Sequence, residues 1–293
     1  MEVVNCTLLE KVVQPRALNS HKGDYGRLLL IGGTYPFGGA IIMAALAAVQ
    51  EAKLRRNLQL IASVATRADV ENIAALHAHL SEAMAFDVQD KKLLTEQVQK
   101  ADVVLIGSGL AESKLEKAVL QLVVKFVSEH QIFIMDGGAI SLFSKEALPF
   151  PKAQTIFTPH QKEWERLSGL KIAEQTVEKS QEAVNSFPAG TIVVQKKHGT
   201  TIFQSGNGNH FQLTIGGPYQ ATGGMGDTLA GMIAGFAGQF KTSSLLERVA
   251  AAVYLHSAIA EELSKENYVV LPTEISKEIP KWMKKLAKKE NML

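Results

Sequence analysis

Short apolar runs alternate with longer amphipathic stretches along most of the chain. The short runs consist mainly of Val, Ile and Leu, which is typical of strands whose two faces are both covered in a parallel sheet. They lie at residues 27–31, 58–65, 103–106, 132–135, 155–157 and 192–195. The alternation predicts βαβ units and an α/β fold with a doubly wound, mostly parallel sheet.

The longer stretches have the spacing of helices. In one of them, residues 114–129, the apolar side chains that recur on one face are Leu115, Val119, Leu122 and Phe126. The other strong helical segments are residues 40–49, 226–240 and 245–263.

Two further apolar runs, residues 200–203 and 210–213, are separated by Ser205-Gly206-Asn207-Gly208. These turn residues predict an antiparallel hairpin at an edge of the sheet. No linker, repeat or low-complexity tract divides the chain, so we predict a single domain over residues 1–293.

Composition and charge exclude several classes of protein. Hydrophobic residues make up 46% of the 293 residues, and the net charge of +2 gives no sign of a nucleic-acid or membrane partner. Cys6 is the only cysteine, which leaves no intramolecular disulfide and no cysteine-based metal site. Residues 1–11 contain Glu2 and Glu10 and do not resemble a signal peptide. No segment reaches the roughly 18 apolar residues of a membrane span, so we expect a cytoplasmic protein.

The C-terminal tail is rich in lysine. Ile279, Met283 and Leu286 recur there at helical spacing, and Pro280 suits the first turn of a helix. We interpret the tail as an amphipathic helix with a solvated lysine face, and a basic patch for an anionic partner is the alternative. The lysines are Lys277, Lys281, Lys284, Lys285, Lys288 and Lys289.

Glycine-containing segments follow several strands, at the positions where open α/β sheets bind ligands. The first runs from Gly32 to Ala40 ahead of an Ala-rich helix, whose N-terminal amides and dipole favour a phosphate. It is not a P-loop, because Gly39-Ala40 stands where a P-loop has Lys and Ser or Thr. The second, Gly107-Ser108-Gly109, is a candidate wall of a ligand cleft. A plain turn is the alternative for both segments.

The segment Thr222-Gly223-Gly224-Met225-Gly226-Asp227 gives the strongest functional signal. Gly223, Gly224 and Gly226 ahead of a helix can form an anion-binding nest of backbone amides. Asp227 would then lie beside the bound phosphate. Because the two negative charges repel, this position favours a base that removes a proton from an attacking hydroxyl. Stabilisation of the helix N-terminus by the Asp227 charge is the structural alternative.

The segment Lys196-Lys197-His198-Gly199-Thr200 lies between a strand and the hairpin. Its lysines can hold a nucleotide phosphate as point charges, or they can form a solvated basic turn. His77 and His79 do not have the spacing of two metal ligands on one helix face, and we interpret them as surface residues. No glycine cluster has the Gly-x-Gly-x-x-Gly spacing, which disfavours an NAD-dependent dehydrogenase.

In this order along the chain, the motifs resemble the NAD(P)H-hydrate dehydratase family of the ribokinase-like superfamily. The Gly-Gly-x-Gly-Asp element that ends at Asp227 is shared with sugar and vitamin kinases. His21-Lys22-Gly23 and Thr158-Pro159-His160-Gln161-Lys162-Glu163 narrow the resemblance to the dehydratases. It extends from about residue 21 to the helix near His256, and without a fused epimerase domain it resembles the stand-alone bacterial form.

The resemblance implies a three-layer, ribokinase-like fold with helices on both faces of the sheet. It implies ADP-dependent dehydration of the (6S) hydrates of NADH and NADPH, which returns NADH or NADPH and gives AMP and phosphate. It also implies Mg²⁺ as cofactor, ATP in place of ADP in eukaryotic forms, and a homo-oligomer such as a tetramer.

The same resemblance assigns roles to individual residues, with Asp227 as the catalytic base. The hydrated dinucleotide is expected to contact Ala40, Gly109, His160 and Asp227. The nucleotide is expected to lie against Lys196, Lys197, His198, Gly199, Thr200 and Gly226. Glu163 matches an acidic position that helps to organise magnesium in related kinases, and an exposed capping acid is its structural alternative.

The sequence departs from the family pattern at four positions, which bear on nucleotide preference and metal contacts. They are Ser108, Gly138, Lys197 and Met225. Two other functions remain open. One is a superfamily kinase that uses Asp227 to phosphorylate a small vitamin-like alcohol, and the other is a nucleotide sensor in which Asp227 only completes a pocket.

Overall fold

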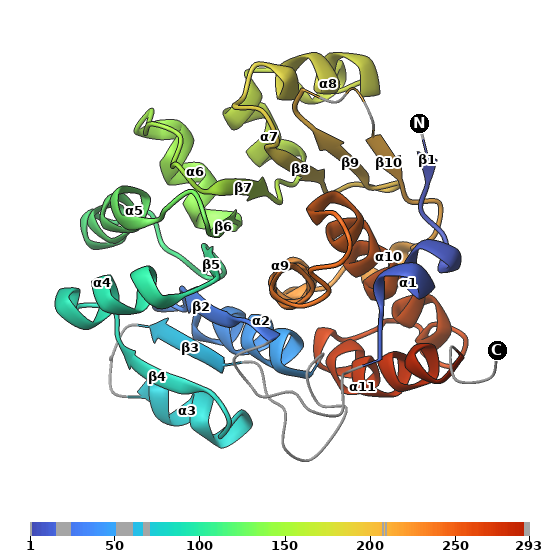
Figure 1. Cartoon of the computed structure of the whole chain (residues 1–293), viewed down its shortest axis with the longest axis horizontal. Helices are drawn as coiled ribbons and strands as arrows, with labels where there is room; N and C mark the ends of the chain where they lie inside the picture. The colour runs from blue at the N-terminus through green and yellow to red at the C-terminus, as the bar shows by residue number, and fades with distance from the viewer. Residues whose placement is uncertain are drawn as a thin grey trace.

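A single sheet runs through the part of the chain that the computed structural model describes, which is residues 2–15, 25–50, 61–66, 71–206, 208 and 210–289. Its strand order is β1-β10-β9-β8-β7-β6-β5-β2-β3-β4 (Figure 1). The strands are β1 (Glu2–Val3), β2 (Arg27–Ile31), β3 (Ile61–Thr66), β4 (Met84–Asp87), β5 (Val103–Ile106), β6 (Ile132–Met135), β7 (Gln154–Phe157), β8 (Ile192–Gln195), β9 (Thr201–Gln204) and β10 (His210–Gln212).

The neighbours from β4 through β3, β2, β5, β6 and β7 to β8 are all parallel. β9 is antiparallel to both β8 and β10, so the predicted hairpin is confirmed. The predicted mostly parallel sheet is confirmed as well. Residues 58–60 of the predicted strand 58–65 lie outside the described residues.

The predicted strands are buried on both faces, as their uniform Val, Ile and Leu content indicates. All four residues of β5 and of β8 are buried. The sequence predicts neither β1 nor β4. β1 consists of two residues, both exposed, and no residue of β4 is buried. These two strands lie at opposite edges of the sheet.

The longer helices agree closely with the sequence prediction. α10 (Leu245–Leu263) has the predicted bounds, whereas α5 (Lys114–Phe126) ends three residues early and α9 (Met225–Gly238) is shifted towards the N-terminus. None of the described helices has the length and apolar character needed to cross a membrane. The other helices are α1 (Cys6–Val12), α2 (Gly38–Gln50), α3 (Glu71–His79), α4 (Lys91–Lys100), α6 (Gly137–Lys145), α7 (Gln161–Ser168), α8 (Val177–Asn185) and α11 (Pro272–Lys289), with the short 3-10 helices η2 (Ile172–Glu174) and η3 (Pro218–Gln220).

The lysine-rich tail forms the predicted amphipathic helix, α11, but the predicted place of Pro280 is wrong. Pro280 lies inside α11, because the helix already begins at Pro272, where Glu274 Oε2 accepts a hydrogen bond from the Leu271 backbone N–H. The apolar face is buried as expected, at Ile279, Met283 and Leu286. The lysines whose side chains are described are exposed, at Lys277, Lys281, Lys284 and Lys285.

Alternate residues of each central strand belong to two separate hydrophobic cores. In β2, Leu28 and Leu30 pack into one core, whereas Leu29 and Ile31 pack into the other. The first core is completed by α1, α2, α3, α9, α10 and α11, and the second by α4 to α8 (Figure 1). Helices therefore cover both faces, which confirms the predicted three-layer architecture.

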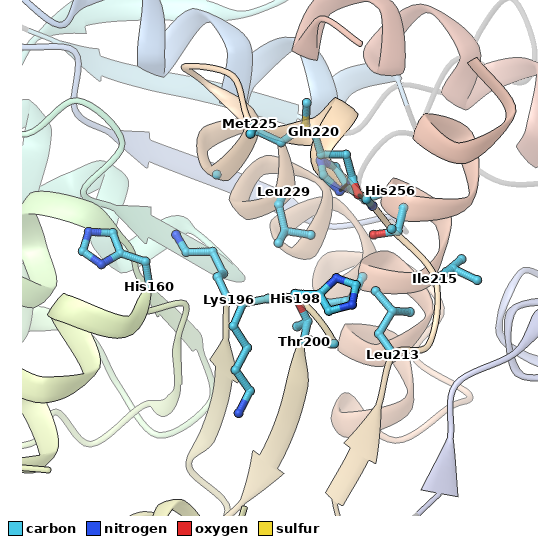
Figure 2. A pocket seen from close by; sticks show the side chains of 18 of the residues that line it. His160, Lys196, His198, Thr200, Leu213, Ile215, Gln220, Met225, Leu229 and His256 are labelled. Atoms are coloured by element: carbon cyan, nitrogen blue, oxygen red, sulfur yellow. Dashed lines mark hydrogen bonds between the residues drawn. The ribbon is translucent and has the colours of Figure 1, made fainter. Parts of the chain in front are cut away.

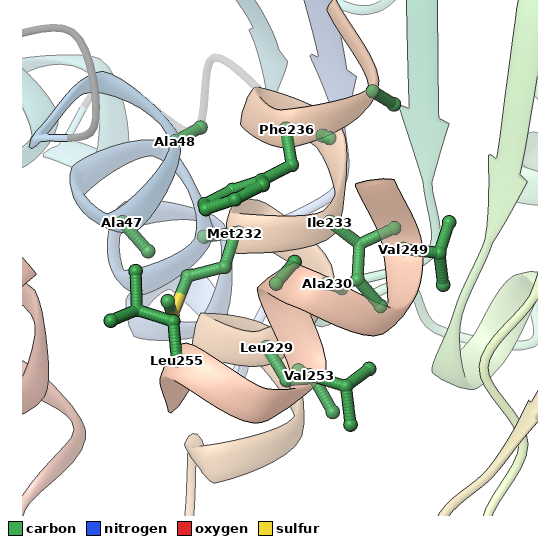
Figure 3. Packing of buried hydrophobic residues seen from close by; sticks show 14 of the residues in the cluster. Ala47, Ala48, Leu229, Ala230, Met232, Ile233, Phe236, Val249, Val253 and Leu255 are labelled. Carbon is green, nitrogen blue, oxygen red and sulfur yellow. The ribbon is translucent and has the colours of Figure 1, made fainter. Parts of the chain in front are cut away.

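The first core brings the N-terminal ends of α2 and α9 to the same edge of the sheet. The two helices pack so closely that a Cβ atom on Gly231 of α9 would lie 2.1 Å from the Ala44 carbonyl oxygen of α2. Figure 3 shows Ala47 and Ala48 of α2 facing Met232 and Phe236 of α9. This packing fixes the start of α9, and with it Asp227, against the loops that follow β2 and β5.

Candidate active site

The carboxyl ends of β5, β6 and β7 converge on the buried side chain of Asp136. Its Oδ1 accepts a hydrogen bond from Thr158 Oγ1 at 2.6 Å and another from Lys196 Nζ at 2.7 Å. Ser108 Oγ donates to Oδ2 at 3.5 Å. Asp136 precedes α6 but makes no side-chain cap to that helix, because its carboxylate is directed to these partners.

Lys196 carries the positive charge of the site. Burial lowers the pKa of Lys196, but the carboxylates of Asp136 and Glu163 outweigh it and raise the pKa above its usual value. Lys196 follows β8, and its backbone pairs with His160 in an isolated bridge. The ammonium therefore stays charged among acidic side chains.

Asp227 lies in the first turn of α9, as predicted. The helix begins after Gly224, whose φ of +88° is in the left-handed region that favours glycine. Burial, followed by the charge of Asp136, raises the pKa of Asp227 to about 6. Lys196 and a hydrogen bond from Ser108 act in the opposite direction. Asp227 thus has the environment of a base that works near neutral pH.

The three glycines of the predicted anion nest differ in their surroundings, and anion binding by their amides stays a prediction. Gly224 is the N-cap of α9, and Gly226 lies inside the helix, where a Cβ atom would be 3.2 Å from Lys196 Nζ. A Cβ atom on Gly223 would meet nothing within 4 Å. Gly226 therefore allows Lys196 to approach the start of α9, whereas packing explains Gly224, where a Cβ atom would lie 2.3 Å from Met43 Cε.

His160 and Glu163 form a capping box at the start of α7. His160 Nδ1 faces the backbone N–H groups of Lys162 and Glu163, and Glu163 Oε2 accepts from the His160 backbone N–H at 2.8 Å. The alternative of a capping acid for Glu163 is thus confirmed, but Glu163 is 6% exposed and not at the surface. Burial raises the pKa of Glu163, and Lys196 opposes this shift. His160 remains half exposed.

A cavity of about 680 Å³ opens beside this acidic cluster. It is lined by every residue of the predicted nucleotide set, Lys196, Lys197, His198, Gly199, Thr200 and Gly226, together with His160. Figure 2 shows Lys196, His198 and Thr200 on one wall and Leu229, Gln220 and His256 on another. The structure therefore brings together residues that are far apart in the sequence.

Besides the polar segment from Lys196 to Thr200, the cavity is lined by apolar residues and by a second polar end. Leu213, Ile215 and Val253 supply apolar surface. At the polar end, Gln220 Nε2 lies 3.5 Å from His256 Nδ1. Burial lowers the pKa of His256 to about 4, so its ring is neutral at physiological pH.

Ala40 and Gly109 lie together, but they do not line this cavity. A Cβ atom on Gly109 would be 2.8 Å from Ala40 Cβ and 2.5 Å from the Phe37 carbonyl oxygen. Ser108, next to Gly109 in the chain, lies close enough to Asp227 to lower the pKa of its carboxyl group. The predicted substrate residues Ala40 and Gly109 are therefore joined to Asp227 through Ser108, on a surface separate from the nucleotide residues.

Close packing explains several glycines of the first segment. Added Cβ atoms would lie 2.1 Å from the Ser108 carbonyl oxygen at Gly32 and 2.4 Å from Asn72 Oδ1 at Gly38. The departure from the family pattern at Gly138 also has a steric cause, since a Cβ atom there would lie 1.8 Å from the Leu110 carbonyl oxygen. A phosphate at the start of α2 stays a prediction.

Three features of the sequence prediction lie elsewhere. Residues 21–24 of the first motif are outside the described residues. His77 and His79 are exposed on α3, as predicted. The described residues contain no group of three or more His, Cys, Asp or Glu side chains that could hold a metal ion.

Sequence reasoning missed the central position of Asp136 and the polar end of the cavity. Asp136 directly follows a predicted strand, and this position could have identified it. Gln220 and His256 are 36 residues apart, in the 3-10 helix η3 and the apolar helix α10, and no local pattern connects them.

Known proteins are similar to this chain in sequence and in fold. The family model for NAD(P)H-hydrate dehydratase matches residues 28–281. The chain is 57% identical over 292 residues to the ADP-dependent (S)-NAD(P)H-hydrate dehydratase of Streptococcus pneumoniae, covering 100% of this chain and 98% of that protein.

Two solved structures are similar. A ribokinase-like superfamily protein from Enterococcus faecalis is 42% identical, with a TM-score of 0.91 and coverage of 98% of this chain and 97% of that one. The ADP/ATP-dependent NAD(P)H-hydrate dehydratase of Bacillus subtilis, co-crystallised with ATP and Mg²⁺, is 27% identical, with a TM-score of 0.82 and coverage of 97% and 98%. Since the family model matches residues 28–281, which is most of the chain, the chain belongs to the NAD(P)H-hydrate dehydratase family.

Proposed function

We propose that this chain dehydrates the (S) hydrates of NADH and NADPH, using ADP as phosphoryl donor, and so repairs the damaged dinucleotides. The observation that carries the proposal is the position of Asp227. Its carboxyl group, with a pKa of about 6, lies next to Gly226 of the nucleotide cavity and is joined through Ser108 to Gly109. A base between two ligand surfaces suits proton removal during group transfer from one ligand to the other.

The chemistry follows from the substrate. Hydroxide is a poor leaving group, so the hydroxyl on the hydrated ring must first be activated. Asp227 accepts the hydroxyl proton while the hydroxyl oxygen attacks the terminal phosphoryl group of ADP, and AMP leaves. The ring nitrogen lone pair then expels phosphate, and loss of a proton from the neighbouring ring carbon restores the reduced nicotinamide.

The positive charge near the transferred group comes from Lys196. Its ammonium is held at Asp136 and lies close to the start of α9. Charge on the transferred group is stabilised best by donors that are already in place before the reaction. The loop from Lys196 to Thr200 would hold the remaining phosphate and ribose of the nucleotide on the cavity wall.

The residues also fit a magnesium ion that arrives with the nucleotide. Mg²⁺ prefers oxygen ligands and commonly binds through one or two carboxylates together with substrate phosphates. The buried carboxylates of Asp136 and Glu163, both close to Lys196, offer such oxygens. When bound, Mg²⁺ supplies charge neutralisation at the phosphoryl group.

The test compares the unchanged chain with Asp227→Asn in the presence of hydrated NADH, Mg²⁺ and ADP. The chain should restore the absorbance of reduced nicotinamide, and Asp227→Asn should lose at least about a hundredfold in kcat, the usual contribution of a general base. Asp90→Asn is the matched control, because Asp90 is an exposed helix cap and Asn also caps helices. A variant Asp227→Asn with full activity would refute the proposed role.

The same assay separates the competing functions. A small-alcohol kinase would leave a stable phosphorylated product and give no reduced nicotinamide. A nucleotide sensor would bind ADP without turnover, in the unchanged chain and in Asp227→Asn alike. Running the assay with ATP in place of ADP identifies the preferred donor.

We further propose a cytoplasmic homo-oligomer, such as a tetramer, which the family resemblance suggests. Sedimentation of the purified chain tests the assembly, and a monomer at micromolar concentration would contradict it.

A further inference from the structure

Two aromatic side chains, Tyr35 and Phe37, are exposed in the turn between β2 and α2. Tyr35 is 82% exposed and Phe37 is 55% exposed. Exposed apolar side chains are common when they are scattered singly, but two rings in one turn at a ligand-binding edge call for a partner.

The turn that carries these rings is firmly held. Thr34 is buried, and its Oγ1 donates to the Gly109 carbonyl oxygen at 2.9 Å and accepts from the Ala111 backbone N–H at 2.8 Å. Asn72 Nδ2 donates to the Gly33 carbonyl oxygen at 3.2 Å. A fixed turn presents its side chains with little loss of conformational entropy on binding.

Phe37 lies next to Gly109. A Cβ atom on Gly109 would lie 2.5 Å from the Phe37 carbonyl oxygen and 3.1 Å from Phe37 Cβ, so Phe37 leaves no room for a side chain at position 109. Ser108, the preceding residue, lies close enough to Asp227 to lower the pKa of its carboxyl group. Phe37 therefore contacts the same short segment that lies beside the proposed base.

The nucleotide cannot be the partner of these rings in its proposed position. The lining of the 680 Å³ cavity includes neither the turn at residues 34–40 nor residues 108–110. The turn lies instead against Gly109 and Ala40, on the side of Asp227 that the proposed function gives to the ligand carrying the hydroxyl.

We infer that Phe37, with Tyr35 beside it in the turn, forms an aromatic wall that packs against the hydrated nicotinamide ring and sets the affinity for this substrate. The inference rests on the proposed function and adds specificity residues to it. A flat aromatic side chain offers a large, rigid apolar surface, against which the partly saturated hydrated ring can pack and so lose contact with water.

The test is steady-state kinetics with hydrated NADH and ADP varied separately. Phe37→Ala should raise KM for hydrated NADH about tenfold, equivalent to about 1.4 kcal/mol. KM for ADP should stay within about twofold, because Phe37 is not in the nucleotide cavity. Tyr35→Ala should raise the same KM, and Phe37→Tyr should restore it because a flat ring is retained.

Met84→Ala is the matched control. Met84 is 53% exposed, like Phe37, but it begins β4 at the amino end of the parallel strands, away from the site. Sedimentation of each variant accompanies the kinetics. Unchanged KM for hydrated NADH in Phe37→Ala, an equal rise in KM for ADP, or a change of assembly state would each overturn the inference.

The two proposals fail in different ways. An unchanged chain without any turnover of hydrated NADH would contradict the proposed function and this inference together. Turnover by the unchanged chain with a Phe37→Ala variant of equal KM would contradict the inference alone.

Discussion

Asp227, Asp136 and Glu163 share a single ammonium group, that of Lys196, in a buried environment. Three acids against one cation leave an excess of negative charge when all are ionised, and the charge of Asp136 raises the pKa of both Asp227 and Glu163. Asp136 makes the direct ion pair with Lys196 at 2.7 Å. Asp227, without such a pair, is the acid whose pKa is raised to about 6. Asp136 is therefore the ion-pair partner of Lys196, and Asp227 is left as the proposed base.

The pKa of Asp227 predicts the acidic limb of the pH–rate profile. Proton removal needs the ionised carboxylate, so kcat/KM should rise with pH, reach half its maximum at about pH 6 and level off at higher pH. Asp136→Asn removes a negative charge that raises this pKa, and the limb should move to lower pH. Ser108→Ala removes a hydrogen bond that lowers the pKa, and the limb should move to higher pH.

Profiles of kcat/KM for the unchanged chain and both variants, from mildly acidic to mildly alkaline pH, check this prediction. Asp90→Asn should leave the limb in place, because Asp90 is an exposed cap on α4. Shifts of the two site variants in the same direction would show that Asp227 does not set the limb.

The sequence alone can point to a site residue when the end of a strand or helix places that residue at the carboxyl ends of the sheet strands. Asp227 is predicted from local pattern, because it follows a glycine run at the start of a helix. The pattern leaves the role of Lys196 open, and only the family resemblance singles out His160. The pairing of Asp136 with Lys196 spans 60 residues and depends on β6, β7 and β8 lying side by side. Strand order results from tertiary packing, and no local pattern in a single sequence specifies it.

At the scale of elements, burial decided which predictions succeeded. Strands such as β5, with every residue buried, have a strong apolar pattern and were predicted with their bounds. The edge strands β1 and β4 are exposed and carry no such pattern. The wrong start of α11 has another origin. A proline is typical of a first helical turn, and α11 contains two, Pro272 at its start and Pro280 in its interior.

The contact between α2 and α9 predicts a severe effect of one small substitution. Gly231→Ala places a Cβ atom about 2 Å from the Ala44 carbonyl oxygen, and a backbone atom in a packed helix cannot move away as a flexible side chain can. We expect a loss of about 1–3 kcal/mol in the free energy of unfolding, as for other overpacked cores. Urea unfolding measures it.

Gly39→Ala is the control for the contact between α2 and α9. Gly39 lies in the first turn of α2, and a Cβ atom there would meet nothing within 4 Å. Since alanine is the better helix former, Gly39→Ala should leave the stability unchanged or increase it by up to about 1 kcal/mol. Equal stabilities for the two alanine variants would show that α2 and α9 are less closely packed than described.

At the scale of the whole molecule, the sheet separates two hydrophobic cores. Residues from both sides of the sheet meet at the carboxyl ends of its strands. Asp136 and His160 come from segments that lead into α6 and α7 of the second core, whereas Asp227 and His256 belong to α9 and α10 of the first. The nucleotide cavity includes residues from both sides, His160 and His256 among them. A ligand in this cavity therefore contacts both layers of helices and should stabilise their arrangement.

This arrangement predicts that Mg²⁺·ADP raises the thermal stability of the chain. A ligand that binds only the folded state at a hundredfold excess over Kd contributes about 2.7 kcal/mol, which corresponds to a Tm increase of several degrees. Lys196→Met should lower the Tm without ligand, because it leaves the buried carboxylate of Asp136 unpaired. The decisive quantity is therefore the increase in Tm on adding Mg²⁺·ADP, which Lys196→Met should largely abolish. Lys179→Met, at an exposed site on α8, should retain the full increase, and a Lys196→Met variant that also retained it would place the nucleotide outside this cavity.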